Sequence, residues 1–368
     1  MRNFFNNLKV STNERISRIE FIIFIIYILL LAIGFFAIKS ATINTTREST
    51  ADRQLIWIII SLIAFFISTI IPERTLKRLI PFSFYFMFFS LILVIFFGTI
   101  IYGAKRWIYL GPFGFQPSEF FKIAVILYFS LILSKNNKFQ YLFASLFLFA
   151  SVFIIYKQPD LGTSIIVFSL WFIALFISGK YDLILKITTI GGLIFSPIIF
   201  LVMPDYQKAR IAGFLFPERY AANVSYNTIQ SIRAIGAGGI TGSGYMNGFM
   251  NLGQFVPENH SDFIISVIGE EFGFIGMLIV LILYFLIFWR LYIGYKISYD
   301  MFWKYYFLLT SFLFGFHIFE NIGMNLGIMP VTGIPLPFLT AGGSTTLSFS
   351  IILGLATKGL MTNKNIKR

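Results

Sequence analysis

The sequence contains no cysteine, and only 12% of its residues are charged. The absence of cysteine excludes disulfides and thiolate metal sites. Histidine occurs only twice in 368 residues, and the 16 acidic residues are outnumbered by 29 lysines and arginines. Any acid–base chemistry must therefore depend on a small number of ionisable side chains.

Apolar residues, in contrast, are abundant: 57% of the chain is hydrophobic and 19% is aromatic. A water-soluble fold could not bury so much apolar surface, which indicates an integral membrane protein. The apolar runs approach the roughly 20 residues that cross a bilayer as helix. They are continuous rather than alternating, which excludes an outer-membrane β-barrel. The sequence therefore predicts an all-α membrane protein.

About ten spans are expected in one polytopic membrane domain, residues 1–368, and an even number puts both termini on one side. We expect the first apolar run to remain as an anchor rather than to be cleaved as a signal. The predicted spans cover residues 20–38, 55–71, 80–101, 119–134, 140–156, 162–178, 183–203, 263–289, 302–325 and 339–361.

The loops on the side of the termini are short and carry nearly twice as many lysines and arginines as the opposite loops. The positive-inside rule therefore predicts cytoplasmic tails at 1–19 and 362–368. This orientation and attraction to anionic membrane lipids account for the net charge of +13 without nucleic acid as a partner. The chain is therefore expected to cross a membrane several times.

The unusual loops all lie on the predicted outer side. They are 102–118, the large extracytoplasmic loop 204–262 between spans seven and eight, and 326–338. The last contains Pro330, Pro335 and Pro337 and no charge, so it cannot form continuous helix. Such a segment is tolerated at membrane depth only where it lines a protein cavity.

Two polar pairs lie within predicted spans at the spacing of one helical turn: Glu119 with Lys122, and His317 with Glu320. Charge within a membrane helix is costly, so each pair either locks helices together or faces a polar cavity. Asp160, at the start of span six, is typical of a helix cap. The glycines between 236 and 244 lack the Gly-Lys-Ser/Thr of a P-loop and indicate a tight turn, although exposed amides there could bind phosphate.

The stretch QFVPENHSDFIISVIGEEFGFIG, residues 254–276, concentrates scarce polar residues at the mouth of a long apolar run. Asp262 could simply cap this helix, with Glu258 and His260 in solvent. Alternatively, the carboxylate of Asp262 lies in a basic cavity, because the outer loops supply Lys105, Arg106, Lys208, Arg210 and Arg233. The second interpretation predicts an outer-leaflet site for an anionic lipid.

Several longer motifs then make the pattern specific. GAKRWIYLG…QPSEFFK, KQPDLGTS, YQKARI, YNTIQSIRAIGAGG, FVPENHSDFIISVIGEEFGFIG and FENIGM…MPVTGIPLPFLTAGGST occur in this order over residues 103–346. The set resembles the SEDS family of bacterial cell-wall proteins over nearly the whole chain. Within that family, FENIGM followed by MPVTGIPLPF is more similar to the elongation member RodA than to the division member FtsW.

The resemblance implies a multi-pass protein of the bacterial cytoplasmic (inner) membrane. It also implies a peptidoglycan glycosyltransferase that polymerises lipid II during cell elongation, by an inverting reaction at the outer face of that membrane. It implies that Asp262 is the catalytic general base. It also implies a class B penicillin-binding protein as partner and admits a divalent cation, Mg²⁺ or Mn²⁺, at the pyrophosphate. The residues it assigns to substrate are Lys105, Arg106, Trp107, Arg210, Glu258 and His260, and those it assigns to a buried ion pair are Glu119 and Lys122.

Three elements depart from the family pattern, one of them Met250-Asn251, which stand where a further small-residue/Gln element is expected. Ser261 replaces the commoner threonine and keeps the hydroxyl, whereas Ser243 stands where a lysine is usual, which weakens a phosphate role for the glycine-rich turn. Two other functions compete with the polymerase: a flippase that transports lipid II, and a non-catalytic scaffold for a penicillin-binding protein. A flippase should carry polar residues accessible from both faces, whereas the predicted inner loops contain no motif.

Overall fold

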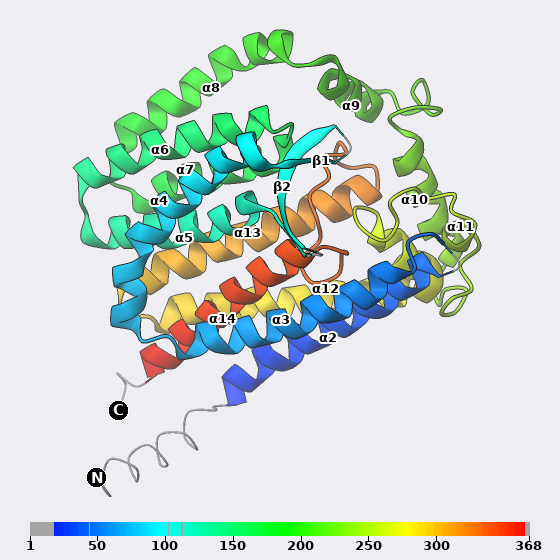
Figure 1. The fold of residues 1–368 in the computed structure, drawn as a ribbon, viewed down its shortest axis with the longest axis horizontal. Helices are drawn as coiled ribbons and strands as arrows, with labels where there is room; N and C mark the ends of the chain where they lie inside the picture. The colour runs from blue at the N-terminus through cyan, green and yellow to red at the C-terminus, as the bar shows by residue number, and fades with distance from the viewer. Residues whose placement is uncertain (1–17, 44, 102, 112, 365–368) are drawn as a thin grey trace, which may run out of the picture.

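The computed structural model describes residues 18–43, 45–101, 103–111 and 113–364. Most of the predicted cytoplasmic tails, 1–19 and 362–368, therefore lies outside the described residues. The described chain forms a bundle of long helices (Figure 1). The ten longest are α2 (Arg18–Thr42), α3 (Ser49–Ile70), α4 (Glu73–Phe97), α5 (Pro117–Lys135), α6 (Lys138–Lys157), α7 (Leu161–Ser178), α8 (Asp182–Val202), α12 (Ile264–Ile297), α13 (Met301–Asn325) and α14 (Gly343–Lys364).

Each of these helices coincides with one predicted span. Within the described part of the chain, nine helices are long and apolar enough to cross a membrane. The tenth predicted span, 183–203, coincides with α8, which is not among those nine. Helix α8 lies at the edge of the bundle and packs against α7 (Figure 1).

The short elements gather at one end of the bundle (Figure 1). Strands β1 (Thr99–Ile101), β2 (Ala104–Leu110) and β3 (Phe113–Phe115) form an antiparallel sheet in the order β1-β2-β3. Residues 99–101 were expected to complete a span and instead form β1, because the chain turns at Gly98 to pair with β2. The large loop contains α9 (Asp205–Leu215), α10 (Tyr226–Gly238) and the single turn α11 (Phe249–Leu252).

Polar side chains mark where several spans begin. Asn137 accepts a hydrogen bond from the amide of Gln140 at the start of α6, and Asp160 accepts one from Thr163 at the start of α7. Such caps satisfy amides that the first helical turn leaves unpaired. The predicted capping role of Asp160 is confirmed.

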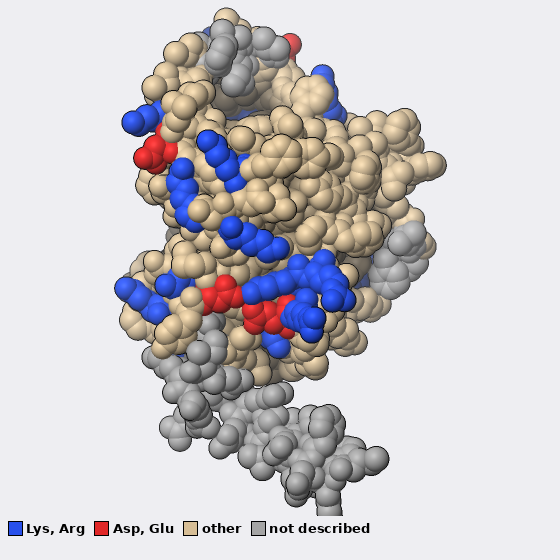
Figure 2. Space-filling model, turned by 90° about the vertical axis from the view of Figure 1, so that its left-hand side faces the viewer, with Lys and Arg blue, Asp and Glu red and all other residues tan. Residues whose placement is uncertain are grey.

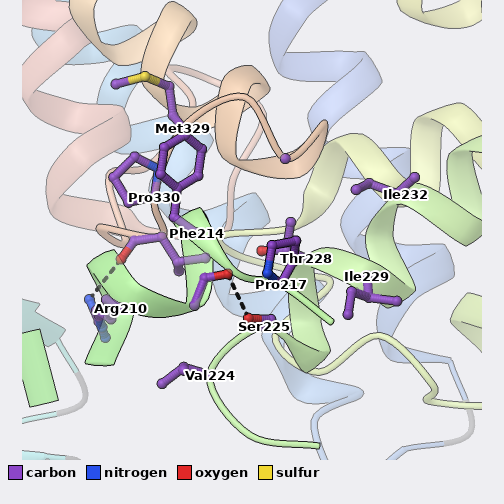
Figure 3. Close-up of a pocket in the computed structure, with 13 residues that line it drawn as sticks. Arg210, Phe214, Pro217, Val224, Ser225, Thr228, Ile229, Ile232, Met329 and Pro330 are labelled. Carbon is purple, nitrogen blue, oxygen red and sulfur yellow. Dashed lines mark hydrogen bonds between the residues drawn. The ribbon is translucent and has the colours of Figure 1, made fainter. Parts of the chain in front are cut away.

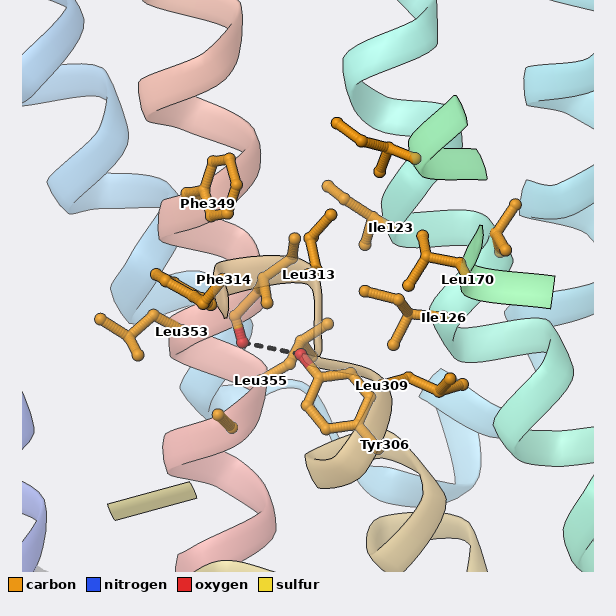
Figure 4. Close-up of a cluster of buried hydrophobic side chains, with 14 of the residues drawn as sticks. Ile123, Ile126, Leu170, Tyr306, Leu309, Leu313, Phe314, Phe349, Leu353 and Leu355 are labelled. Atoms are coloured by element: carbon orange, nitrogen blue, oxygen red, sulfur yellow. Dashed lines mark hydrogen bonds between the residues drawn. The ribbon is translucent and has the colours of Figure 1, made fainter. Parts of the chain in front are cut away.

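The core lies where α5 and α13 meet α7 and α14. Helix α5 is buried along nearly its whole length. Ile123 and Ile126 of α5 face Leu313 of α13 across this core (Figure 4). The hydroxyl of Tyr306 donates a 2.7 Å hydrogen bond to the carbonyl of Ile352, which ties α13 to α14. This rigid centre holds the C-terminal end of α13 in place.

Between α13 and α14 the chain runs through residues 326–342 without helix, as its prolines predict. Ile334, Leu336 and Phe338 in this unwound segment are buried. The carbonyl of Pro337 accepts a 2.5 Å hydrogen bond from the hydroxyl of Tyr284 on α12. The part of the segment from Ile334 to Phe338 therefore lies within protein rather than against lipid.

Helix α12 is broken at Gly273, whose φ of 64° is accessible mainly to glycine. The glycine-rich turn packs into this break. Amides of Ser243 and Gly244 donate to the carbonyls of Glu270 and Glu271, and the amides of the two residues after Gly273 donate to the turn in return. Because these amides are bonded to α12, the turn locks the helix, as a tight turn should.

Basic residues collect at the opposite end of the bundle, where α2 begins and α14 ends (Figures 1 and 2). Lys77 of α4 lies 2.6 Å from Glu73 and 2.5 Å from Asp300, the cap of α13. The same end carries the lysines of the turns between α5 and α6 and between α7 and α8. This arrangement agrees with the charge pattern from which the orientation was predicted.

Candidate active site

Asp262 lies at the end of the bundle formed by the sheet and the short helices, immediately before α12. Its main-chain carbonyl accepts hydrogen bonds from the side-chain amides of Asn321, at 3.0 Å, and Asn325, at 3.1 Å. Both asparagines are fully buried and lie one turn apart on α13. The rigid helix therefore fixes the backbone of Asp262 and leaves its carboxylate free to point elsewhere.

The carboxylate does not cap the helix. Residue Phe263 is the N-cap of α12, and it makes no side-chain capping hydrogen bond. The interpretation of Asp262 as a simple cap is therefore wrong. Instead, the carboxylate faces the unwound segment: a methyl group added at Gly333 would lie 3.4 Å from its Oδ2 atom.

Four consecutive residues, 331–334, form a strip that joins this carboxylate to its surroundings. The strip's first carbonyl, that of Val331, accepts a 3.1 Å hydrogen bond from Nη1 of Arg210. Its last, that of Ile334, accepts one from Asn321 at 2.9 Å. Polar groups from α9, α13 and the start of α12 therefore converge on one short piece of extended chain.

Glu258 and His260 lie beside Asp262 in a cluster organised by Arg47. The guanidinium of Arg47, from the connection between α2 and α3, lies 3.0 Å from Oε1 of Glu258 and 3.5 Å from Nδ1 of His260. Glu258 also has a φ of 54°, a strained value for a residue with a side chain. Burial lowers the pKa of His260 and Arg47 lowers it further, against the opposing effect of Glu258.

Burial raises the pKa of Asp262 to about 6, and the carboxylate of Glu258 contributes in the same direction. Arg210 and Arg106 oppose this rise because their positive charges favour the ionised form. A carboxylate with this pKa is a stronger base than an exposed aspartate and is still ionised at neutral pH. Such a group suits proton abstraction from a hydroxyl.

Arg210 stands at the head of a small apolar groove (Figure 3). Its guanidinium is directed at the strip, and the groove continues between α9, α10 and the unwound segment. Phe214, Ile229 and Met329 contribute apolar walls. A cationic head above an apolar channel is complementary to an anionic lipid.

Arg106 is placed on β2 near the start of α7. Its Nε atom donates to the carbonyl of Gln158 at 3.0 Å, and its Nη1 lies 3.8 Å from the carboxylate of Asp160. The start of α7 touches the strip, because a methyl group at Gly162 would lie 2.8 Å from Ile334. Arg106 therefore lies where the start of α7 meets the strip, within electrostatic reach of Asp262.

Lys105 and Trp107 lie two residues apart on β2, and the contacts seen for them are with α4 and β1. The ammonium of Lys105 donates to the carbonyls of Ile95 and Phe96 at the end of α4, at 2.6 and 3.0 Å. Trp107 pairs with Thr99 of β1. Their substrate contacts stay predictions, and among the described residues we find no direct bond from either to Asp262.

The predicted ion pair is present: Nζ of Lys122 lies 2.9 Å from Glu119, and both side chains are almost completely buried. The ammonium also lies 3.2 Å from Nε2 of His317, whose Nδ1 lies 2.8 Å from the carbonyl of Pro335. A lysine can only donate, so Nε2 accepts and Nδ1 carries the hydrogen. This chain of bonds joins α5, α13 and the unwound segment.

Sequence reasoning missed three partners of the site: Arg47, Asn321 and Asn325. The two asparagines follow one another at i and i+4 in FENIGMN, which was a usable signal because polar residues on one face of a membrane helix point into the bundle. Arg47 offered no such signal, since it was one of several basic residues in loops.

Comparison with known proteins agrees with this architecture. Residues 20–365 match the family model described as cell cycle protein, which covers FtsW, RodA and SpoVE. The chain belongs to this family. It is 34% identical to the peptidoglycan glycosyltransferase MrdB of Escherichia coli K12, over 86% of this chain and 88% of that protein. It is also 34% identical to the probable peptidoglycan glycosyltransferase FtsW of Haemophilus influenzae, over 90% and 88% of the two chains.

Two solved structures share the fold. A chain from a peptidoglycan synthase complex that coordinates polymerization and crosslinking superposes with a TM-score of 0.77 at 26% identity, covering 93% of this chain and 97% of that one. The rod shape determining protein RodA of Thermus thermophilus gives 0.66 at 24% identity, covering 94% and 97%. The likeness to RodA in the sequence is thus confirmed, and this family member is a multi-pass protein of the bacterial inner membrane.

Proposed function

We propose that this family member is a peptidoglycan glycosyltransferase that polymerises lipid II at the outer face of the cytoplasmic membrane during elongation. The observation that carries the proposal is the carboxylate of Asp262, fixed through its backbone by Asn321 and Asn325 and flanked by cationic Arg210 and Arg106. Relatives that match it over most of their length are named peptidoglycan glycosyltransferases. The groove below Arg210 suits a lipid-linked diphosphate.

The proposed reaction is inverting. The 4-hydroxyl oxygen of the acceptor sugar attacks C1 of the donor sugar while its proton passes to the carboxylate of Asp262. The bond from C1 to the diphosphate oxygen breaks, and its electron pair leaves with the undecaprenyl pyrophosphate. General base assistance of this kind typically accelerates a reaction by about 10²–10⁴-fold.

Positive charge must balance the departing pyrophosphate. Arg210 is the best placed candidate, because it acts on Asp262 electrostatically and borders the apolar groove. Arg106 comes second, since its guanidinium is partly engaged with carbonyls before α7. Lys105, Trp107, Glu258 and His260 are proposed to line the wider substrate cavity.

A divalent cation, Mg²⁺ or Mn²⁺, is part of the proposal in a limited form. Among the described residues there is no group of three or more histidines, aspartates and glutamates able to hold a metal. The protein alone is therefore a poor match for a resident ion. A cation would arrive on the diphosphate oxygens, where Mg²⁺ commonly keeps several waters, and it would neutralise part of their charge.

We also propose a class B penicillin-binding protein as the partner that crosslinks the new strands. The support is the likeness to a chain from a complex that couples polymerization with crosslinking. Membrane lipids are the remaining partners, bound along the apolar faces of the spans.

The test is polymerisation of labelled lipid II by the purified protein together with its partner transpeptidase, in detergent. Detergent removes the barrier between two leaflets, so a protein that only transports lipid II would leave the substrate unchanged. Glycan strands resolved by gel electrophoresis support the proposal. Lipid II that stays monomeric with an intact, folded protein would favour the flippase or the scaffold instead.

A further inference from the structure

Glu320 is a buried acid that the reaction above does not use. It lies on α13 directly before Asn321, and only 2% of its surface is exposed. The hydroxyl of Thr332 donates a hydrogen bond to Oε1. The other oxygen, Oε2, is buried and has no hydrogen-bond partner among the described residues. A buried oxygen that is both charged and unpaired is costly, so this carboxyl needs an explanation.

The 331–334 strip places Glu320 beside the site. Thr332, which bonds Glu320, is the strip residue immediately before Gly333, which faces Oδ2 of Asp262. Arg210 bonds the carbonyl directly before Thr332. Glu320 consequently lies within electrostatic reach of both Asp262 and Arg210.

Two carboxyl groups in one poorly solvated site cannot both ionise at ordinary pH, because each negative charge disfavours the other. The proton stays with the group that water solvates less. Glu320 is fully enclosed, whereas Asp262 is partly open at the mouth of α12. A protonated Oε2 would also remove the unpaired buried charge.

We propose that Glu320 is a second acid of this site, which holds a proton while Asp262 is ionised, so that the site offers one negative charge rather than two to a diphosphate substrate. This inference rests on the proposed function and adds to it a positioning residue that does not touch the substrate. Ionisation of Glu320 at higher pH adds a negative charge near Arg210 and weakens diphosphate binding there.

The other ionisable groups around Glu320 lie on α13 itself and on neighbouring elements, and they are already engaged. One turn earlier on α13, His317 accepts from Lys122 of α5. Where α7 meets the strip, Asp160 faces Arg106. Asp262 and Arg210 are thus the charges that respond most directly to the protonation of Glu320.

The test compares kcat/KM for labelled lipid II against pH in the wild type and in Glu320→Gln. Glutamine keeps the shape of a protonated glutamate and can still accept from Thr332, but it never becomes negative. We expect the alkaline decline of the wild-type profile to move up by about one pH unit or to disappear in Glu320→Gln.

Glu271→Gln is the matched control. Glu271 is equally buried and accepts from one hydroxyl, that of Ser40, and its Oε2 likewise has no hydrogen-bond partner within the described part of the chain. However, it lies in the α12 break, away from the strip. Its variant should keep the wild-type alkaline limb. If the alkaline decline of kcat/KM occurs at the same pH in the wild type and in Glu320→Gln, the inference is overturned. It is also overturned if Glu271→Gln shifts that decline as far as Glu320→Gln does.

A second measurement does not depend on activity or on the folding of Glu320→Gln. The infrared band of a protonated carboxyl group is followed against pH in Glu271→Gln with and without Asp262→Asn. We expect such a band at neutral pH, which disappears as the pH is raised and the carboxyl group ionises. In Asp262→Asn, where the like charge is removed, this disappearance should occur at a lower pH. Absence of the band at neutral pH, or no response to Asp262→Asn, overturns the inference. An inactive wild type with the expected infrared response would count against the proposed function alone.

Discussion

The acid side of the pH profile offers a quantitative test of Asp262 as the base. Burial, reinforced by Glu258, raises the pKa of Asp262 to about 6. A base must be ionised to accept a proton, so on the acid side kcat/KM should reach its plateau as the pH rises through this pKa and should fall tenfold per pH unit below it. An aspartate with the ordinary value of 3.8 would keep its activity far below pH 6.

Neighbouring charges set where this limb lies. Glu258→Gln removes a like charge, which lowers the pKa of Asp262 and moves the limb to lower pH. Arg210→Gln removes an opposing charge and moves it to higher pH. A unit charge about 10 Å away, at an effective dielectric constant of about 20, contributes about 1–2 kcal/mol before salt screening. Each displacement should therefore be on the order of half to one pH unit.

The assay measures initial rates of glycan formation from labelled lipid II between pH 4.5 and 8, at about 0.15 M salt, with protein integrity checked at each pH. We expect the acid limb of the wild-type kcat/KM profile near pH 6. It should lie at lower pH in Glu258→Gln and at higher pH in Arg210→Gln. A limb near pH 4 in the wild type, or two displacements in the same direction, would refute the reasoning.

Two further predictions concern stability. Lys122→Met leaves the buried Glu119 without its partner and should destabilise the protein by about 3–5 kcal/mol in thermal unfolding. The double variant Lys122→Met with Glu119→Gln should recover most of that stability, because no buried charge is left unpaired. Equal losses of stability in the single and the double variant would contradict the ion-pair account. Gly238→Ala places a methyl group 1.9 Å from the carbonyl of Gly269 and should separate α10 from α12, at a cost of about 3 kcal/mol or more. Gly236→Ala, with nothing within 4 Å, is the control and should melt like the wild type.

The spans could be predicted because membrane helices are encoded locally, by continuous apolar runs of sufficient length and by the charged residues at the ends of those runs. All ten predicted spans coincide with helices, and the break at 326–338 followed from the geometry of proline alone. The sheet at 99–115 was missed because two of its strands, β1 and β3, have only three residues each and show no alternating pattern. The break of α12 at Gly273 was hidden because the apolar run continues through it.

The site was predictable in its residue types rather than in its partners. Asp262 stood out as an acid at the start of a span, but its fixation depends on Asn321 and Asn325, which are some 60 positions away in the chain. Likewise, Arg47 meets Glu258 across more than 200 residues. Such contacts arise from the packing of helices, which no local pattern records.

The most direct test of the account is the effect of Asp262→Asn on glycan synthesis. The asparagines of α13 bind the main-chain carbonyl of residue 262, so this substitution keeps the fold and removes only the base. We expect a variant that melts within about 1 kcal/mol of the wild type and still binds lipid II, with polymerisation reduced at least about 10²-fold. Glycan strands formed at the wild-type rate by Asp262→Asn would contradict the central claim.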